Sequence, residues 1–271
     1  MEMKKQVGIL LTEVRKQVPL VHNITNYVTV NDCANVVLAI GASPIMADDR
    51  REVEDITSIA SALVINIGTL NERTVESMLL AGKKANEKQI PVIFDPVGAG
   101  ASAFRNETTK KIIEEVKISI LRGNLSEVSY IAGLEVATKG VDSAESDNRN
   151  DSVDVAKKAA KQIGGVVAIT GVTDVISNGE KVIKIHNGTK RLSKVTGTGC
   201  MTSALAGSYA GAGKDYLTAA VAGVASMAIA GEIAEEKTKD TGLGSFHMAV
   251  IDALSNLDAD EIEKRAKFDE E

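Results

Sequence analysis

The stretch Val195-Thr196-Gly197-Thr198-Gly199-Cys200-Met201-Thr202-Ser203-Ala204-Leu205 sets two glycines directly before a run of small and helix-forming residues. Gly197 and Gly199 propagate a helix poorly and can adopt a positive φ, whereas most residues from Cys200 onward favour a helix. We therefore predict that an extended segment, 190–195, leads through a glycine turn into a helix N-terminus. The rest of the chain is interpreted around this turn.

A helix N-terminus of this kind presents free backbone N–H groups and partial positive charge to an anion. Gly197, Thr198, Gly199 and Cys200 are therefore candidates for an anion hole around a phosphate or a developing oxyanion. A thiolate in the first turn of such a helix would be stabilised. The alternative is a simple tight turn in which Cys200 is a small buried hydrophobic residue.

Two common nucleotide-binding motifs do not match this region. The dinucleotide fingerprint needs a third glycine at the position of Thr202, which disfavours a dehydrogenase. A Walker A loop ends in Gly-Lys-Ser or Gly-Lys-Thr, but Asp215 follows Gly213-Lys214, and Ser208 stands where the first glycine would be. Residues 208–215 are therefore not a P-loop.

The composition indicates an ordinary globular protein. The chain has 271 residues, of which 44% are hydrophobic and 25% charged, enough to build a core. Its net charge is −6 and no basic stripe is present, so nucleic acid is not an expected partner. Residues 1–18 read as an amphipathic helix and no apolar run reaches about 18 residues, so neither a signal peptide nor a membrane partner is expected. Two cysteines suggest no disulfide framework and fit a reduced, cytoplasmic location.

Strand and helix patterns alternate along most of the chain. We predict strands within 20–26, 44–46, 61–67, 90–95, 118–124 and 165–170, a hairpin around Asn178-Gly179, and helices over 2–17, 30–40, 71–88, 104–116, 152–163, 200–237 (split near Gly213), 243–256 and 258–268. The polar segment 143–151 is predicted to be a surface loop. This order predicts an α/β fold: a single domain over 1–271 with one doubly wound, mainly parallel sheet, helices on both faces and a late antiparallel hairpin.

Polar residues stand at the ends of several predicted strands, where an open α/β sheet binds its ligands. Asp95 and Thr170 end two strands, and Arg122 lies near the end of a third, where it could meet a phosphate. Glu127 could act near phosphates or hold hydrated Mg²⁺. The ordinary alternatives remain open: a turn-forming Asp before proline, a surface arginine, and a first-turn glutamate favoured by the helix dipole.

The segment 20–26 ends one further strand with His22, Asn23, Thr25 and Asn26. These side chains could contact a small polar ligand, or they could only bond to nearby backbone groups. From its pattern alone, Met46 reads as a core residue. Taken together, the strand-end residues fit phosphoryl transfer, in which positioning and charge stabilisation supply most of the catalysis.

Four segments resemble the hydroxyethylthiazole kinase family of the ribokinase-like superfamily, and the resemblance covers essentially the whole chain. They are Val21–Val28, Asp95–Gly100, Arg122–Glu127 and Thr196–Cys200. Within the third, Asn124 to Glu127 matches the Asn-x-x-Glu element that the wider superfamily uses around Mg²⁺ and phosphate. The resemblance implies ATP-dependent phosphorylation of the primary alcohol of 4-methyl-5-(2-hydroxyethyl)thiazole for thiamine biosynthesis.

The resemblance also assigns roles to individual residues. It implies thiazole contacts at Asn26, Met46, Gly68 and Gly197, ATP contacts at Arg122 and Thr170, Mg²⁺ at Asp95 and Glu127, and Cys200 where most ribokinase-like sugar kinases carry a catalytic Asp. The family is similar in forming homotrimers with the thiazole site across a subunit interface.

Cys200 is expected to assist catalysis without being essential. A free thiol has a pKa near 8.5, far above that of an Asp carboxyl near 3.9, and a loose transition state needs little help from a base. Two alternatives to the thiazole kinase remain: another ribokinase-like kinase for a vitamin precursor, and a non-catalytic nucleotide-binding protein. The presence of Asp95, Glu127, Arg122 and Thr170 together argues against the second.

Overall fold

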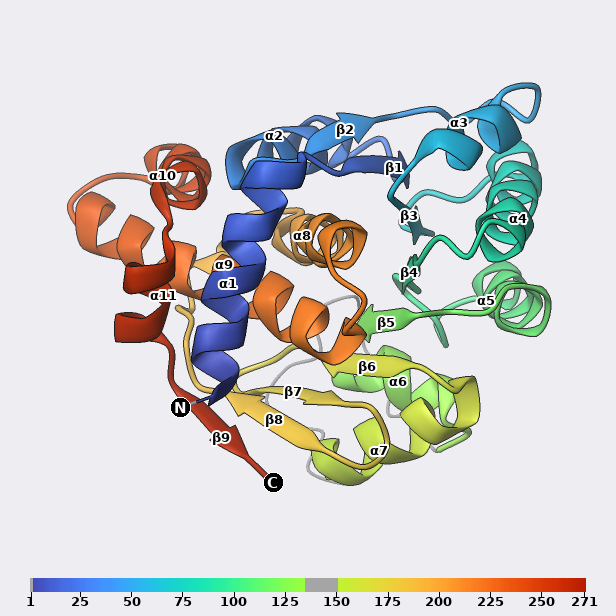
Figure 1. The fold of residues 1–271 in the computed structure, drawn as a ribbon. Helices are drawn as coiled ribbons and strands as arrows, with labels where there is room; N and C mark the ends of the chain where they lie inside the picture. The colour runs from blue at the N-terminus through green and yellow to red at the C-terminus, as the bar shows by residue number, and fades with distance from the viewer. Residues whose placement is uncertain (1, 135–150) are drawn as a thin grey trace.

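The computed structural model describes residues 2–134 and 151–271 (Figure 1). Within these residues the strands form one sheet in the order β2-β1-β3-β4-β5-β6-β7-β8-β9. The strands are β1 Leu20–Ile24, β2 Ser43–Ile45, β3 Ala62–Asn66, β4 Val92–Asp95, β5 Ile120–Gly123, β6 Val166–Ile169, β7 Asp174–Ser177, β8 Val182–Ile185 and β9 Phe268–Glu270. Pairings from β2 through β6 are parallel and those from β6 to β9 are antiparallel.

Helices cover both faces of the sheet, as Figure 1 shows. On one face lie α1 Glu2–Gln17, α2 Val30–Ile40, α8 Thr198–Ala212, α9 Tyr216–Thr238, α10 Leu243–Asn256 and α11 Ala259–Arg265. On the other lie α3 Val53–Ile59, α4 Glu72–Glu87, α5 Ala103–Glu115, α6 Leu125–Ile131 and α7 Ser152–Ile163. The prediction of a doubly wound, mainly parallel sheet with a late antiparallel hairpin is confirmed.

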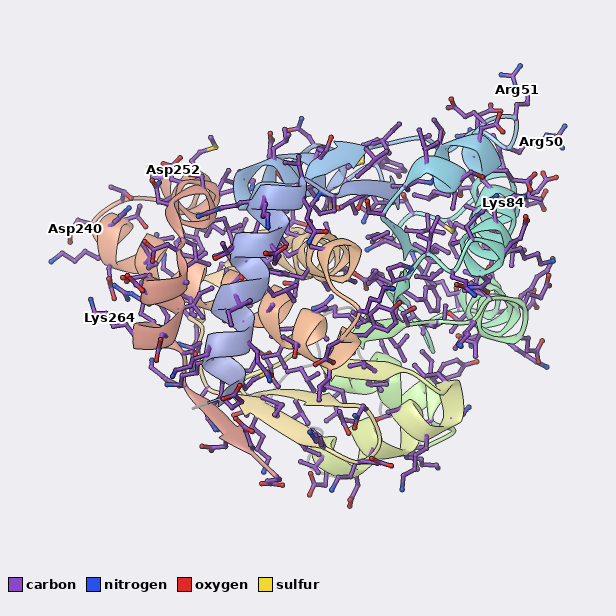
Figure 2. All side chains as sticks on the ribbon, in the orientation of Figure 1. Arg50, Arg51, Lys84, Asp240, Asp252 and Lys264 are labelled. Carbon is purple, nitrogen blue, oxygen red and sulfur yellow. The ribbon has the colours of Figure 1, made fainter. Side chains whose placement is uncertain are left out.

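Successive residues of a strand point to opposite sides of the sheet and pack into two apolar cores, one on each side. In β3, Val64 enters the core shared with α8 and α9, while Leu63 and Ile65 enter the core shared with α4. Charged side chains such as Arg50, Arg51, Asp240 and Lys264 project from the periphery (Figure 2). The two apolar cores therefore lie along the sheet, and these charged side chains lie outside them.

Helix α8 lies close to the sheet because it has a glycine where the two elements meet. A Cβ built on Gly207 would lie 2.6 Å from Cγ2 of Val64 in β3. The neighbouring α9 approaches α8 through Gly223, where an added Cβ would lie 2.7 Å from the Ala206 backbone. These small residues fix the depth of α8, and with it the position of its N-terminus.

Helix α9 bears on the expected absence of a membrane span. By length and composition it could cross a membrane, the one such helix in the described part of the chain, although Glu232 interrupts its apolar run. However, 89% of its apolar window is buried in this fold, so we interpret α9 as a core helix. The two cysteines, Cys33 and Cys200, are free, as expected.

Two local predictions were wrong, and one helix was missed. The segment expected to be extended over 190–195 contains a 3₁₀ turn at Leu192–Lys194, where Ser193 Oγ donates to Lys190 O and no strand among the described residues pairs with the segment. The helix α3 was not predicted. The helix expected over 258–268 ends at Arg265, because Phe268–Glu270 pairs with β8 as the edge strand β9. The loop predicted at 143–151 lies outside the described residues, apart from Asp151, which caps α7.

Candidate active site

The candidate site lies where the parallel strands end and α8 begins. The predicted glycine turn is present: Gly197 is the N-cap of α8 with φ of 87°, a backbone conformation that favours glycine. A Cβ at this position would also lie 2.6 Å from Cγ2 of Thr29. The free N–H groups of α8 therefore begin beside the loop that leads into α2.

Asp95, at the end of β4, is fully buried and joins three other elements. Its Oδ2 accepts hydrogen bonds from Ser203 Oγ at 2.6 Å and Asn66 Nδ2 at 2.9 Å, and it lies 3.6 Å from Arg122 Nη1. Its Oδ1 is buried without a hydrogen-bond partner among the described residues. Burial raises the pKa of Asp95, while the Arg122 charge and the Ser203 hydroxyl act in the opposite direction.

Arg122 connects Asp95 to two further predicted residues. Its Nη2 donates a short hydrogen bond to Thr170 Oγ1, and its guanidinium lies against the first turn of α8. A Cβ built on Gly199 would lie 2.5 Å from Arg122 Nη1, so the guanidinium packs directly against this glycine. The two predicted ATP contacts and the predicted anion hole are thus brought together.

Cys200 lies on the opposite side of the same turn. Asn26 Nδ2 donates to Cys200 Sγ at 3.3 Å and to Asn66 Oδ1 at 3.0 Å. Burial raises the pKa of the Cys200 thiol, and the nearby charge of Asp95 raises it further. The stabilised thiolate expected from the helix N-terminus is therefore not supported, because the effect of desolvation on the pKa outweighs that of the neighbouring donors.

The predicted thiazole contacts are only partly brought together. Gly68 N donates to Asn66 Oδ1 at 2.9 Å, and a Cβ on Gly68 would lie 2.9 Å from the Asn26 side chain. Gly197 contacts Thr29, whose hydroxyl donates to Asn26 Oδ1 at 3.1 Å. Met46 follows β2 and packs, partly buried, against the core on the α8 side, with no described bond to the other site residues.

The polar residues of β1 have structural roles. His22 lies buried between Thr57 Oγ1 and the carbonyl oxygen of Ala47, at 2.9 and 2.8 Å, and its burial lowers its pKa. Asn23 bonds to the Val21 carbonyl. Of the two readings that the sequence left open for this segment, local bonding describes Asn23, whereas His22 bonds to residues that are 25 and 35 positions away in the chain.

Glu127 is a buried first-turn residue of α6 with both carboxylate oxygens in use. Oε1 accepts from Gly98 N and Oε2 from Asn124 N, each at 2.8 Å, and Asn124 in turn caps the Glu127 N–H. Burial, reinforced by the charge of Asp95, raises the pKa of Glu127 to about 7. Glu127 thus ties the loop after β4 to the start of α6 and responds electrostatically to Asp95.

Three residues of this network were missed from the sequence. Asn66 ends β3 and was detectable by the strand-end rule that selected Asp95. Ser203 is three residues after Cys200, a spacing that places both side chains on one face of a helix. Thr29 had no comparable signal, because it acts only through its contacts with Asn26 and Gly197.

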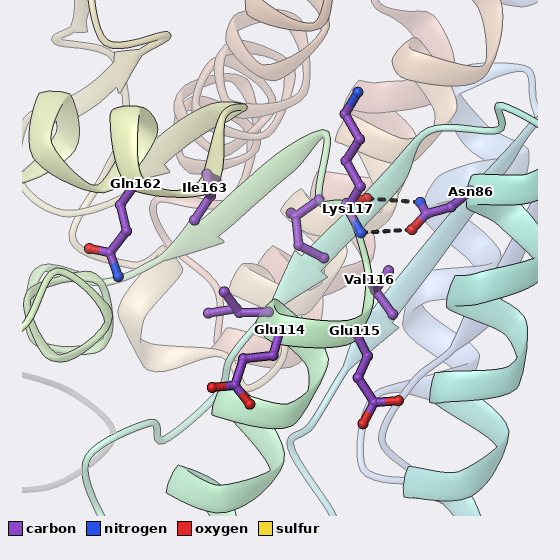
Figure 3. Close-up of a pocket in the computed structure, with 9 residues that line it drawn as sticks. Asn86, Glu114, Glu115, Val116, Lys117, Gln162 and Ile163 are labelled. Atoms are coloured by element: carbon purple, nitrogen blue, oxygen red, sulfur yellow. Dashed lines mark hydrogen bonds between the residues drawn. The ribbon is translucent and has the colours of Figure 1, made fainter.

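A surface pocket of about 420 Å³ lies apart from this network (Figure 3). It is lined by the end of α5, the loop between α5 and β5 and residues of α4 and α7, among them Asn86 and Lys117. The Asn86 amide bonds to the Lys117 backbone N–H and C=O at 2.7 and 3.0 Å, so these polar groups satisfy one another. None of the predicted site residues lines this pocket.

Comparison with known proteins identifies the family. Residues 11–260 match the model of the hydroxyethylthiazole kinase family. The hydroxyethylthiazole kinase of Clostridium beijerinckii is 64% identical, with 99% of each chain covered, and that of Ruminiclostridium cellulolyticum is 65% identical, also with 99% of each covered.

Solved structures agree with this result. The structure of the hydroxyethylthiazole kinase protein from Pyrococcus horikoshii OT3 matches with a TM-score of 0.89 at 37% identity and 98% coverage of each chain. An ADP complex of Bacillus subtilis pyridoxal kinase matches with a TM-score of 0.60 at 18% identity, covering 79% of this chain and 91% of that one, which supports the ribokinase-like fold alone. With the sequence matches spanning nearly its full length, this chain belongs to the hydroxyethylthiazole kinase family.

Proposed function

We propose that this chain transfers the γ-phosphoryl group of ATP to the primary hydroxyl of 4-methyl-5-(2-hydroxyethyl)thiazole, as a step of thiamine salvage. The observation that carries the proposal is one continuous network. It runs from Thr170 through Arg122 to Asp95, and from there through Asn66 and Asn26 to the thiol at the start of α8. Membership of the family supplies the choice of acceptor.

In this proposal, Arg122 and Thr170 bind the phosphates of ATP, and the first turn of α8 stabilises charge as the phosphoryl group moves. Backbone N–H groups fixed before the reaction are effective in this role, because they need no reorganisation in the transition state. The Arg122 guanidinium lies against Gly199, so the guanidinium and the N-terminus of α8 place their positive charge at the same end of the site. The acceptor oxygen forms its bond to phosphorus as the bond to the ADP oxygen breaks.

The thiazole end of the site is proposed to comprise Asn26, Met46, Gly68 and Gly197. The Asn26 amide already donates to Cys200 Sγ, which places the thiol beside the proposed acceptor side. With its pKa raised, Cys200 acts mainly by orienting the hydroxyl rather than as a pre-formed thiolate. This role agrees with the small demand for a base in a loose transition state.

The residues proposed for Mg²⁺ fit an ion held largely through water. Asp95 Oδ1 is a buried oxygen without a hydrogen bond in the described residues, whereas both Glu127 oxygens accept backbone N–H bonds. Mg²⁺ prefers oxygen ligands and usually retains several waters. When bound, Mg²⁺ would neutralise charge on the transferred and leaving phosphates.

We also propose that the chain works as a single kinase domain in a cytoplasmic homotrimer, with the thiazole site at a subunit interface. Tyr27 and Val28 support the position of the interface, because they follow Asn26 directly and are 78% and 55% exposed. Large exposed apolar side chains beside a site are typical of an interaction surface. No nucleic-acid or membrane partner is proposed.

The test is release of ADP from ATP and Mg²⁺, with and without hydroxyethylthiazole, with mass spectrometry of the product. A panel of other vitamin-precursor alcohols, pyridoxal among them, is assayed in parallel. Thiazole-dependent release with a phosphorylated thiazole is the expected result. If ADP is released only with another alcohol, the protein is still a kinase but its substrate is that alcohol. If folded protein releases no ADP with any alcohol of the panel, the non-catalytic nucleotide-binding alternative is favoured.

A further inference from the structure

Arg105, in the first turn of α5, binds three backbone carbonyl groups from two separate loops. Its Nη1 donates to Ile67 O at 2.6 Å and to Val97 O at 2.5 Å, and its Nη2 donates to Gly68 O at 2.7 Å. The first loop follows β3 and the second follows β4. Because the guanidinium is planar and its donors are fixed relative to one another, three simultaneous bonds fix the two loops relative to each other.

Both loops carry residues of the proposed site. Gly68, whose carbonyl accepts from Arg105, lies against Asn26, where an added Cβ would come within 2.9 Å of the amide. Gly98, next to Val97, donates its N–H to Glu127 Oε1 at 2.8 Å. Arg105 therefore lies between the thiazole side and the metal side of the site, although nothing in the sequence marked it.

The loop after β4 needs an external support of this kind. Gly98 and Gly100 have φ values of 74° and 93°, and glycine has little conformational preference of its own. The start of α5 holds this loop at two points: Arg105 binds the Val97 carbonyl, and Asn106 Oδ1 accepts from Gly100 N at 2.7 Å. Without Arg105, all three carbonyls would lose the side-chain bonds through which it joins the two loops.

We propose that Arg105 is a positioning residue for phosphoryl transfer, which sets the distance between the thiazole-side loop and the Asp95–Gly98 loop. The inference rests on the proposed function, because it assigns Arg105 to the same site. Arg105 acts through these two loops and not by touching the thiazole. A lysine offers a single point charge in place of a planar fork, so it would restore only part of the effect.

The experiment compares Arg105→Ala and Arg105→Lys with wild type at saturating Mg²⁺ and at a temperature where circular dichroism shows each protein folded. We expect Arg105→Ala to raise the KM for thiazole about tenfold, as the loss of charge-assisted hydrogen bonds implies, and the KM for ATP less than about twofold. Arg105→Lys should lie between. Arg15→Ala is the matched control, since Arg15 also binds a carbonyl, that of Ser255 at 3.3 Å, but on α1.

Chemical rescue separates positioning from stability. Millimolar guanidinium ion should lower the thiazole KM of Arg105→Ala toward the wild-type value, whereas urea at the same concentration should not, because only the ion restores the charged planar donor set. A lowered melting temperature with an unchanged thiazole KM, or an equal rise in both KM values, would overturn the positioning role.

The two hypotheses fail in different ways. If folded wild-type protein phosphorylates no thiazole, the proposed function and this inference fall together. If wild type is active and both Arg105 variants match it in the thiazole KM, only the inference falls. Should Arg105→Ala not fold, Arg105→Lys retains the stem and charge and gives the same decision from its ratio of KM values.

Discussion

Burial and the Asp95 charge both raise the pKa of the Cys200 thiol, which favours its protonated form. We therefore expect Cys200→Ala to lower kcat by less than about a hundredfold, the low end of what a general base contributes. Steady-state release of ADP measures this. Asp95→Asn, which changes the centre of the network, should cost far more. A complete loss of turnover in Cys200→Ala with thiazole binding intact would show that the thiol is essential.

Cys200→Asp tests whether a base at position 200 can take part in the reaction. A carboxylate there would match the base of the wider superfamily, so we expect kcat within about tenfold of wild type. Its pKa will also be raised by burial near Asp95, so the activity of this variant should increase with pH. A folded but inactive Cys200→Asp protein would count against a base at this position.

Asp174, outside the proposed machinery, gives a prediction for stability. Its Oδ1 accepts from Gly171 N at 2.9 Å, and burial raises its pKa from 3.8 to about 7. The folded state thus binds this proton more tightly than the unfolded chain does. The resulting stability is present below about pH 4 and is lost as the pH rises through about 7.

Asp174→Asn keeps the hydrogen-bond acceptor and removes the titration. From about pH 4 to about pH 8, the free energy of unfolding of wild type should fall by roughly 2–4 kcal/mol relative to Asp174→Asn. Denaturant titrations at both pH values measure this difference. The contributions of the other titrating groups to the free energy of unfolding are the same in both proteins and cancel in the comparison. If the free energy of unfolding changed with pH by the same amount in wild type and Asp174→Asn, the raised pKa of Asp174 would be contradicted.

At the scale of the element, α8 owes its position to close approach by glycines. We expect Gly223→Ala to lower the free energy of unfolding by about 1–3 kcal/mol, because its Cβ would meet the Ala206 backbone at 2.7 Å and a backbone cannot move aside cheaply. The intrinsic gain of about 1 kcal/mol for Gly to Ala in a helix would not offset this.

Gly244→Ala in α10 is the matched control, since an added Cβ there meets nothing within 4 Å. This change should be neutral or stabilising by up to about 1 kcal/mol. Denaturant unfolding of both variants gives the comparison. Equal effects at the two positions would mean that helix propensity, and not packing of α9 on α8, governs Gly223.

Elements with a strong periodic pattern were predictable, and elements defined by their partners were not. Helices α1, α2 and α7 have the bounds that their sequence predicted. The three-residue strand β9 exists because β8 offers it an edge, which no local pattern reveals. The segment before Gly197 was expected to be extended, but no strand in the described part of the chain pairs with it, and its residues Leu192–Lys194 form a 3₁₀ turn.

The candidate site likewise contains residues that the sequence predicted and residues that it did not. Asp95, Arg122 and Thr170 were predicted from strand ends, and their mutual contacts agree with that rule. Arg105 was not, because its acceptors are backbone groups eight to 38 residues away in the chain. The raised pKa of Cys200 favours the alternative that the sequence left open, a small buried residue, over a stabilised thiolate.

At the scale of the whole molecule, we expect the protein in solution to have three times the chain mass of 28.5 kDa, measured by light scattering after size exclusion. Tyr27→Arg should produce smaller species and raise the thiazole KM, because it places a charge on the exposed apolar segment beside Asn26. Ile59→Arg, at a 68% exposed position of α3 on the other face, should leave mass and KM unchanged. A monomeric wild type with full activity would refute the shared site.

The bonds of Arg105 have a consequence for how such an enzyme can change over evolutionary time. All three acceptors are backbone carbonyls, which every amino acid carries, so the identities of the side chains at Ile67 and Val97 do not enter these bonds. Substitutions in the two loops can therefore alter the shape of the acceptor pocket while the loops keep their relative position. Substrate preference is then free to drift around a constant backbone frame, and one arginine side chain preserves that frame.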